Sequence, residues 1–204
     1  DLGNDFFALF LDPTMMYSSA IFAQPDMTLE AAQLARLDHI CRKLDLTPRD
    51  HLLEIGTGWG GMAIHAAQHY GCRVTTTTIS QEQFNLASER VRAAGLEDRI
   101  SVLLKDYRDL DGQYDKLVSI EMIEAVGHDF YDTYFGKCAT LLKDDGLMLL
   151  QAITIADQRY DAARKSVDFI QRYIFPGSCI PSVTAMNASI TRASDLKLAH
   201  LEDI

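Results

Sequence analysis

The sequence predicts an α/β protein built on a mostly parallel sheet with helices on both faces. Short apolar runs typical of strands alternate with longer segments of helical periodicity. These runs are continuously apolar rather than alternating, which is typical of strands buried on both faces. A glycine cluster also joins the first predicted strand to the next helix. The 204 residues suffice for one such domain or for a large fragment of a longer protein.

The first elements follow from capping residues and periodicity. Thr28 is the expected N-cap of a helix whose apolar residues recur every three or four positions, and Pro48 stops it. Residues 52–55 form the first predicted strand. Residues 62–70 form the next helix, and 73–79, rich in β-branched residues, the second strand.

The same alternation continues to the end of the chain. Ser80 and Gln83 predict a capping box at the start of a helix, and Gly95 ends it. A further helix is expected over residues 129–142, and a late strand over 196–201. The remaining predicted strands are residues 100–104, 116–120 and 147–150.

Composition and charge exclude several classes of protein. Hydrophobic residues make up 48 % and charged residues 24 %, which is typical of a globular domain and not of a disordered chain. The net charge of −10 disfavours a nucleic-acid partner. Neither a membrane span nor a signal peptide is evident, so we expect a cytoplasmic protein. The four widely spaced cysteines predict reduced thiols rather than a disulfide framework or a zinc ribbon.

The glycine-rich loop over residues 56–61 indicates a ligand site. Its spacing fits both the dinucleotide fingerprint and the acidic-x-Gly-x-Gly-x-Gly loop that holds the methionine end of S-adenosylmethionine. The second strand ends in Thr77 and Thr78 and lacks the acidic residue that a nicotinamide site needs for its ribose. Glu54 can hold an ammonium group, which S-adenosylmethionine carries. The loop therefore favours S-adenosylmethionine, and the absence of Gly-Lys-Ser/Thr excludes a P-loop.

No metal site is expected. His65 and His69 have the i, i+4 spacing of zinc ligands, but no Glu follows His65 and no third ligand is evident.

Seven segments together resemble the cyclopropane-fatty-acyl-phospholipid synthase family. They occur in that family's order, and the resemblance covers essentially the whole chain. It implies a three-layer, Rossmann-like class I methyltransferase sheet that lacks its last strand in this fragment. The segments are residues 1–7, 16–22, 54–61, 78–83, 105–110, 121–127 and 173–177.

The resemblance also implies the cofactor and its contacts. Tyr17 and Ser18 would cover the methionine and sulfonium of S-adenosylmethionine, and the glycine loop would lie beneath them. The residues implied for the loop, the ribose, the adenine and the floor are, in that order, Gly56, Gly58 and Gly60; Thr78, Ser80 and Gln83; Asp106, Tyr107 and Arg108; and Ile120.

The implied reaction is methyl transfer to a cis double bond of an unsaturated phospholipid acyl chain. An alkene is a poor nucleophile, so the attack leaves a carbocation, and a base must then remove a proton to close a cyclopropane ring. In the family that base is a bound bicarbonate, held in part by the residue that corresponds to Glu124. Ser19 and Gln151 stand near this pocket where better-known synthases have Cys and His, and Ala125 replaces another His. Ser19 offers a hydroxyl or backbone N–H and Gln151 an amide donor, so both are expected to help bind the anion at the catalytic site.

These departures leave alternatives open. Olefin methylation without ring closure, another small-molecule methyl transfer, and an inactive lipid- or cofactor-binding protein are all compatible with the sequence. Peripheral contact with the inner face of the membrane would rest on the last quarter of the chain or on sequence outside it, and the sequence sets no oligomeric state. The expected division is a cofactor-covering segment (1–27), a cofactor-binding core (28–155), and a lipid-side helical insert with the late strand (156–204).

Aromatic residues could line an acyl tunnel or fill the core. They are Phe130, Tyr131, Tyr134, Phe135, Phe169, Tyr173 and Phe175.

Overall fold

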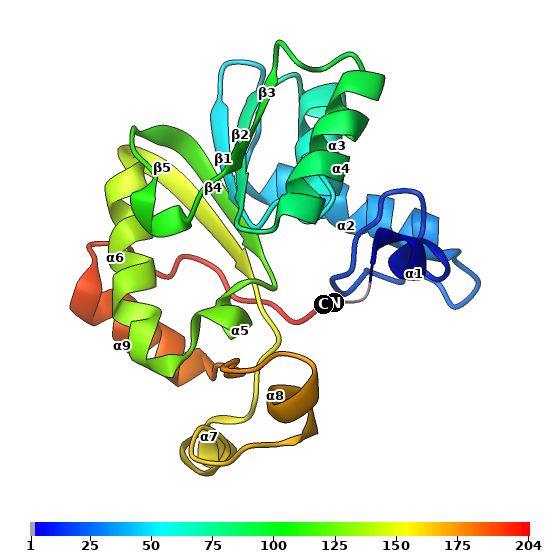
Figure 1. The fold of residues 1–204 in the computed structure, drawn as a ribbon. Helices are drawn as coiled ribbons and strands as arrows, with labels where there is room; N and C mark the ends of the chain where they lie inside the picture. The colour runs from blue at the N-terminus through cyan, green and yellow to red at the C-terminus, as the bar shows by residue number, and fades with distance from the viewer. Residues whose placement is uncertain (1–2) are drawn as a thin grey trace. The chain divides into compact units, whose positions relative to one another are not determined.

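The computed structural model describes residues 3–204 and divides them into two compact units (Figure 1). The first unit runs through Val118 and takes in residues 142–149 and Ile204, and the second comprises Ser119–Leu141 and Leu150–Asp203. Asp1 and Leu2, which begin the first family-like segment, lie outside the described residues.

A five-stranded sheet of order β3-β2-β1-β4-β5 organises the first unit. β1 pairs in parallel with both β2 and β4, so that Leu53 lies opposite Thr75 on one side and Leu117 on the other. The strand order reverses at β1, and in such sheets ligands bind beyond the carboxyl ends of the strands at that point. The strands are β1 (His51–Ile55), β2 (Arg73–Thr78), β3 (Ile100–Leu104), β4 (Tyr114–Ile120) and β5 (Leu142–Gln151).

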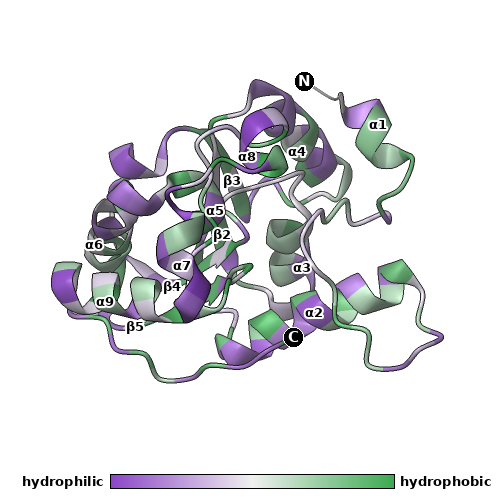
Figure 2. Cartoon of the chain, turned by 90° about the horizontal axis from the view of Figure 1, so that it is seen from below, coloured by the Kyte–Doolittle hydropathy of each residue, from purple (hydrophilic) through white to green (hydrophobic). Residues whose placement is uncertain are grey.

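The helices of the first unit confirm the predicted periodicity and the cap at Thr28. Thr28 accepts a hydrogen bond from the backbone N–H of Ala31 at 3.2 Å, and Leu37 and Cys41 are fully buried on the inner face of the helix that follows. Figure 2 shows hydrophobic and hydrophilic residues alternating along α2, as a half-buried helix requires. These helices are α1 (Asn4–Ala8), α2 (Leu29–Lys43), α3 (Gly61–Tyr70), α4 (Gln81–Ala93) and the 3₁₀ turn η1 (Tyr107–Asp109).

The second unit is mostly helical. Its α6 packs against α9, and Asp132 of α6 forms an ion pair with Arg192 of α9 at 2.6 Å. The predicted aromatic set divides here: Tyr131, Tyr134 and Phe135 are buried core residues. Phe130, Phe169, Tyr173 and Phe175 are exposed. The helices are α5 (Ile123–Val126), η2 (His128–Phe130), α6 (Tyr131–Leu141), α7 (Asp157–Ala163), α8 (Phe169–Tyr173) and α9 (Val183–Ala193).

The late strand predicted over residues 196–201 was wrong. Within the described chain, residues 195–204 contain no helix or strand. A strand exists only where a neighbour completes its ladder, and none of the five strands of the sheet pairs with this segment. The division of the chain into residues 1–27, 28–155 and 156–204 stays a prediction.

Two further expectations concern the whole of residues 3–204. No helix in this range is long and apolar enough to cross a membrane. All four cysteines are free thiols, and all four are buried.

Candidate active site

The glycine loop leaves β1 in a conformation that depends on glycine. Gly56, Gly58 and Gly60 have φ values of +104°, +52° and +85°, which other residues rarely adopt. The backbone N–H groups of Gly56 and Thr57 both donate to the carbonyl of Thr77, at 3.1 and 3.0 Å. The loop is thereby fixed to the end of β2, and α3 starts directly behind it.

The glycine loop is open at Gly58. A Cβ added to Gly58 would meet no atom of the described residues within 4 Å. The loop is therefore an open cradle at the carboxyl end of β1, as a bound ligand requires.

The N-terminal segment, defined here as residues 12–18, packs directly on the glycine loop. A Cβ on Gly61 would lie 2.6 Å from the carbonyl oxygen of Thr14 and 2.7 Å from the sulfur of Met16. Just before this segment, Phe7 stacks on Trp59 with ring centroids 4.8 Å apart. The loop and the N-terminal segment thus form two walls of one site within the first unit.

Tyr17 and Ser18 end this segment, where the methionine and sulfonium are expected. Tyr17 is 55 % exposed and its ring contacts Phe7 edge-on at 5.4 Å. The hydroxyl of Ser18 is buried and has no hydrogen-bond partner among residues 3–204. An unpaired buried hydroxyl is costly unless a ligand completes its hydrogen bonds.

Glu54 brings a buried carboxyl group to the end of β1. Its side chain is 2 % exposed, and its Oε2 atom lacks a partner among the described residues. Burial raises the pKa of Glu54 from 4.5 to about 8, although a hydrogen bond from Thr76 and the charge of Arg36 act in the opposite direction. A bound ammonium group would supply the missing partner and favour the ionised carboxylate.

A buried polar pair on α2, which was not predicted from the sequence, supports these walls. Arg36 is fully buried and donates from Nε and Nη2 to Oε1 of Gln33, at 3.1 and 2.7 Å. Nε2 of Gln33 donates in turn to the carbonyls of Met16 and Ser18, at 3.2 and 2.8 Å. The signal was their place on the buried face of α2, because Gln33 lies four residues before Leu37 and Arg36 four residues before Ile40.

The three residues expected at the ribose form one hydrogen-bonded group at the end of β2. Ser80 accepts from the backbone N–H of Gln83 at 3.3 Å, which is one half of the predicted capping box. The other half is absent from the described contacts, because Oε1 of Gln83 accepts from the Thr78 hydroxyl at 2.8 Å. The backbone N–H of Ser80 also donates to that hydroxyl, at 3.1 Å. Thr78 thus replaces Ser80 as the partner of the glutamine side chain.

The residues expected at the adenine lie after β3. Asp106 caps the turn η1 and accepts from the backbone and the guanidinium of Arg108 at 2.7–3.0 Å. These bonds hold the pKa of Asp106 below its ordinary value. Asp106 is therefore an ionised acceptor, which suits an amino group, and Tyr107 is half-buried beside it.

In the second unit, backbone N–H groups hold both the main chain and the side chain of Glu124. Its carbonyl oxygen accepts from the N–H of Cys179 at 2.8 Å, and its Oε1 accepts from the N–H of Ile153 at 2.6 Å. Its Oε2 is buried and unpaired within residues 3–204. Burial raises the pKa of Glu124, and the nearby charge of Glu121 adds to the effect.

Gln151, expected to present its amide to a bound anion, is committed to Glu121. Its Nε2 donates to Oε1 of Glu121 at 2.8 Å, and its carbonyl accepts from the N–H of Glu121 at 2.8 Å. Glu121 has a φ of +48°, which is unusual for this residue type and marks a constrained backbone. Ile120, the expected floor residue, precedes it at the end of β4 and is half-buried. Ser19 belongs to the first unit and is exposed.

The geometry of the first unit suits S-adenosylmethionine. The buried orphaned atoms of Ser18 and Glu54 and the open cradle at Gly58 call for a ligand with polar and cationic groups. The ionised Asp106 adds an acceptor at the other end, after β3.

Comparison with known proteins identifies the family. The model of the mycolic acid cyclopropane synthetase family matches residues 1–204, the whole chain. The chain belongs to this family. It spans about half the length of the curated relatives it matches.

Relatives of known description support the family assignment. The chain is 47 % identical to the cyclopropane-fatty-acyl-phospholipid synthase of Escherichia coli K12, over 90 % of this chain and 46 % of the relative. It is 46 % identical to the tuberculostearic acid methyltransferase UfaA1 of Mycobacterium tuberculosis, over 91 % of this chain and 45 % of that protein.

A solved structure confirms the predicted fold of this synthetase family member. The mycolic acid cyclopropane synthase CmaA1, complexed with SAH and CTAB, superposes with a TM-score of 0.89 at 34 % identity. The match covers 97 % of this chain and 72 % of that one. The class I methyltransferase sheet and the membership in a family of S-adenosylmethionine-dependent methyltransferases are both confirmed.

Proposed function

We propose that this chain is the catalytic part of an enzyme that transfers the methyl group of S-adenosylmethionine to a cis double bond of an unsaturated phospholipid acyl chain and closes a cyclopropane ring. The observation that carries the proposal is Glu124, whose Oε1 is held by the main chain while Oε2 stays buried without a partner among the described residues. This geometry leaves one carboxyl oxygen for a bound group.

A bicarbonate base would fit the chemistry of this oxygen. Two anions side by side repel, so one of them should be protonated or strongly hydrogen-bonded. Burial raises the pKa of Glu124, which favours the protonated carboxyl group, and this form can donate a hydrogen bond to bicarbonate. A bicarbonate held there would supply the base that ring closure needs, because the added methyl group must lose a proton.

The first unit would hold the cofactor, which supplies an electrophilic methyl group on its sulfonium. Glu54 binds the ammonium group, the Ser18 hydroxyl completes its hydrogen bonds at the methionine end, and Asp106 accepts from the adenine amino group. The glycine loop lets the backbone approach the ligand closely. The complex of CmaA1 with SAH supports a cofactor of this class.

One observation favours a second product, a methylated or methylene-bearing chain without a ring. The amide of Gln151 donates to Glu121, so it is less available to hold the base than the sequence suggested. One relative is described as a tuberculostearic acid methyltransferase and another, from Pseudomonas putida, as a probable fatty acid methyltransferase.

The test uses the full-length protein, labelled S-adenosylmethionine and vesicles of unsaturated phospholipid. Label in the fatty-acid fraction with a mass gain of one CH₂ is expected. Mild hydrogenation then distinguishes the products, because a methylene branch takes up hydrogen and a cyclopropane ring resists it. No label in the acyl chains would refute the proposal.

A further inference from the structure

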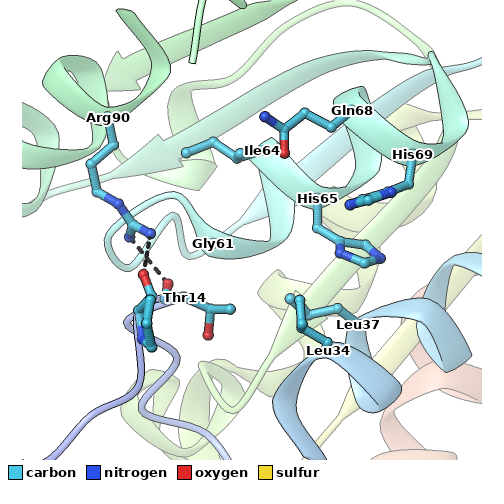
Figure 3. Close-up of a pocket in the computed structure, with 10 residues that line it drawn as sticks. Thr14, Leu34, Leu37, Gly61, Ile64, His65, Gln68, His69 and Arg90 are labelled. Carbon is cyan, nitrogen blue, oxygen red and sulfur yellow. Dashed lines mark hydrogen bonds between the residues drawn. The ribbon is translucent and has the colours of Figure 1, made fainter. Parts of the chain in front are cut away.

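Arg90 of α4 binds three backbone carbonyls that belong to the two walls of the cofactor site. Its Nη1 donates to the carbonyls of Trp59, at 2.6 Å, and of Thr14, at 3.1 Å. Its Nη2 donates to the carbonyl of Pro13 at 2.8 Å. Figure 3 shows the guanidinium reaching from α4 to the chain at Thr14, beside a cavity of about 150 Å³. One side chain therefore joins the glycine loop to the N-terminal segment.

The turn that Arg90 holds is itself tight. Asp12 accepts from both the backbone N–H and the hydroxyl of Thr14, at 3.0 and 2.8 Å. Met15 follows with a φ of +57°, so the chain reverses sharply before it reaches Tyr17 and Ser18. A displacement of Pro13 and Thr14 would thus carry the two covering residues with it.

The same helix carries a residue expected at the ribose. Gln83 lies in the first turn of α4, seven residues before Arg90, which places both on one face of the helix. Part of the guanidinium is buried, which lowers the pKa of Arg90, and the charge of Asp12 partly offsets this. The planar fork of arginine can serve three acceptors in fixed directions, whereas the single ammonium of lysine cannot hold the same geometry.

We propose that Arg90 is a positioning residue that couples the N-terminal segment to the glycine loop and so sets the distance between the two walls that enclose S-adenosylmethionine. The inference rests on the proposed function for the identity of the ligand. Arg90 acts through the backbone at Trp59, Pro13 and Thr14, and it needs no contact with the cofactor.

The test compares Arg90→Lys and Arg90→Met with Arg99→Lys in the full-length protein. Arg99 is the matched control, because it is exposed and also donates to a backbone carbonyl, that of Gly71, at 2.6 Å. Binding of S-adenosylhomocysteine is measured by calorimetry. Hydrogen exchange of the amides of residues 14–18 and thermal unfolding are measured without ligand.

Loss of one charge-assisted hydrogen bond predicts a dissociation constant about tenfold higher in Arg90→Lys and higher still in Arg90→Met. Exchange in the N-terminal segment is expected to quicken, while the melting temperature of Arg90→Lys stays close to that of Arg99→Lys. Arg99→Lys is expected to bind like the wild type.

Wild-type affinity and protection in both Arg90 variants would overturn the inference. So would equal losses of affinity in Arg90→Lys and Arg99→Lys that follow their melting temperatures, because the role would then be structural. A wild-type protein that bound no S-adenosylhomocysteine would instead refute the proposed function, and this inference with it.

Discussion

Replacing Glu54 with Gln is expected to stabilise the cofactor-free protein at neutral pH and to weaken cofactor binding. The carboxyl group is 2 % exposed, and burial raises its pKa from 4.5 to about 8. At pH 7 the folded protein therefore holds a proton on Glu54 that the unfolded chain has lost. The stability that this group contributes is complete below about pH 4.5 and is lost as the pH rises through about 8.

The size of the effect follows from proton linkage. Between pH 5.5 and 7.5 the wild-type protein loses roughly 2 to 3 kcal/mol of stability through Glu54. A glutamine at this position cannot titrate, so the gap between the variant and the wild type widens by this amount. For a domain of this size the gap corresponds to roughly 5–10 °C in melting temperature.

The assay is thermal unfolding of the full-length protein across this pH range, with Glu89→Gln as the matched control. Glu89 is exposed on α4, so its variant should follow the wild type. Calorimetry with S-adenosylhomocysteine should show wild-type affinity rising with pH as Glu54 ionises, and a weaker, flatter response in Glu54→Gln. A constant difference in melting temperature between Glu54→Gln and the wild type would refute the buried, protonated carboxyl group. Unchanged affinity would refute its contact with the ammonium.

Three other substitutions test separate parts of the site. Glu124→Ala should lower turnover with labelled S-adenosylmethionine by about 10- to 100-fold, with unchanged binding of S-adenosylhomocysteine, because bicarbonate loses a hydrogen bond that holds it. Turnover equal to that of the wild type would show that Glu124 does not hold the base. Gly61→Ala should raise the dissociation constant about tenfold, because its Cβ would meet Thr14 at 2.6 Å and the N-terminal segment must shift. In Gly3→Ala the added Cβ meets nothing among the described residues within 4 Å, so wild-type binding is expected by calorimetry. Gln33→Leu removes the acceptor of two Arg36 hydrogen bonds and should cost about 2 kcal/mol in urea unfolding. Gln33→Glu keeps that acceptor and should lose less, and equal losses would show that the Arg36 contact contributes little.

Local signals predicted most of the fold. The cap at Thr28 and the apolar stripe after it placed the start of α2 correctly, because both depend on neighbours in sequence, although the helix ends at Lys43, before the predicted stop at Pro48. The late strand failed for the opposite reason. Residues 196–201 have the apolar content of a strand, but a strand also needs a partner that this segment does not find in the described sheet.

The candidate site was predictable where the residue type indicates the backbone conformation. The glycines of the loop are visible in the sequence, and Gly56, Gly58 and Gly60 do adopt positive φ angles. Arg90 could not be found in this way, because its acceptors are backbone carbonyls 31, 76 and 77 residues away, and any residue type can provide a carbonyl. The positive φ of Glu121 likewise has no signature in its side chain.

The way Glu124 is held also sets off one stretch of the second unit from the rest of that unit. The backbone N–H groups of Ile153 and Cys179 both donate to Glu124, and that of Ile155 donates to the carbonyl of Pro181 at 2.9 Å. The two ends of the stretch 154–178 are therefore held close together. Lengthening a loop whose ends are fixed costs little free energy, because the closure entropy grows only slowly with length. Helices α7 and α8 can therefore diverge in sequence and length among relatives while the carboxylate at their base keeps its position.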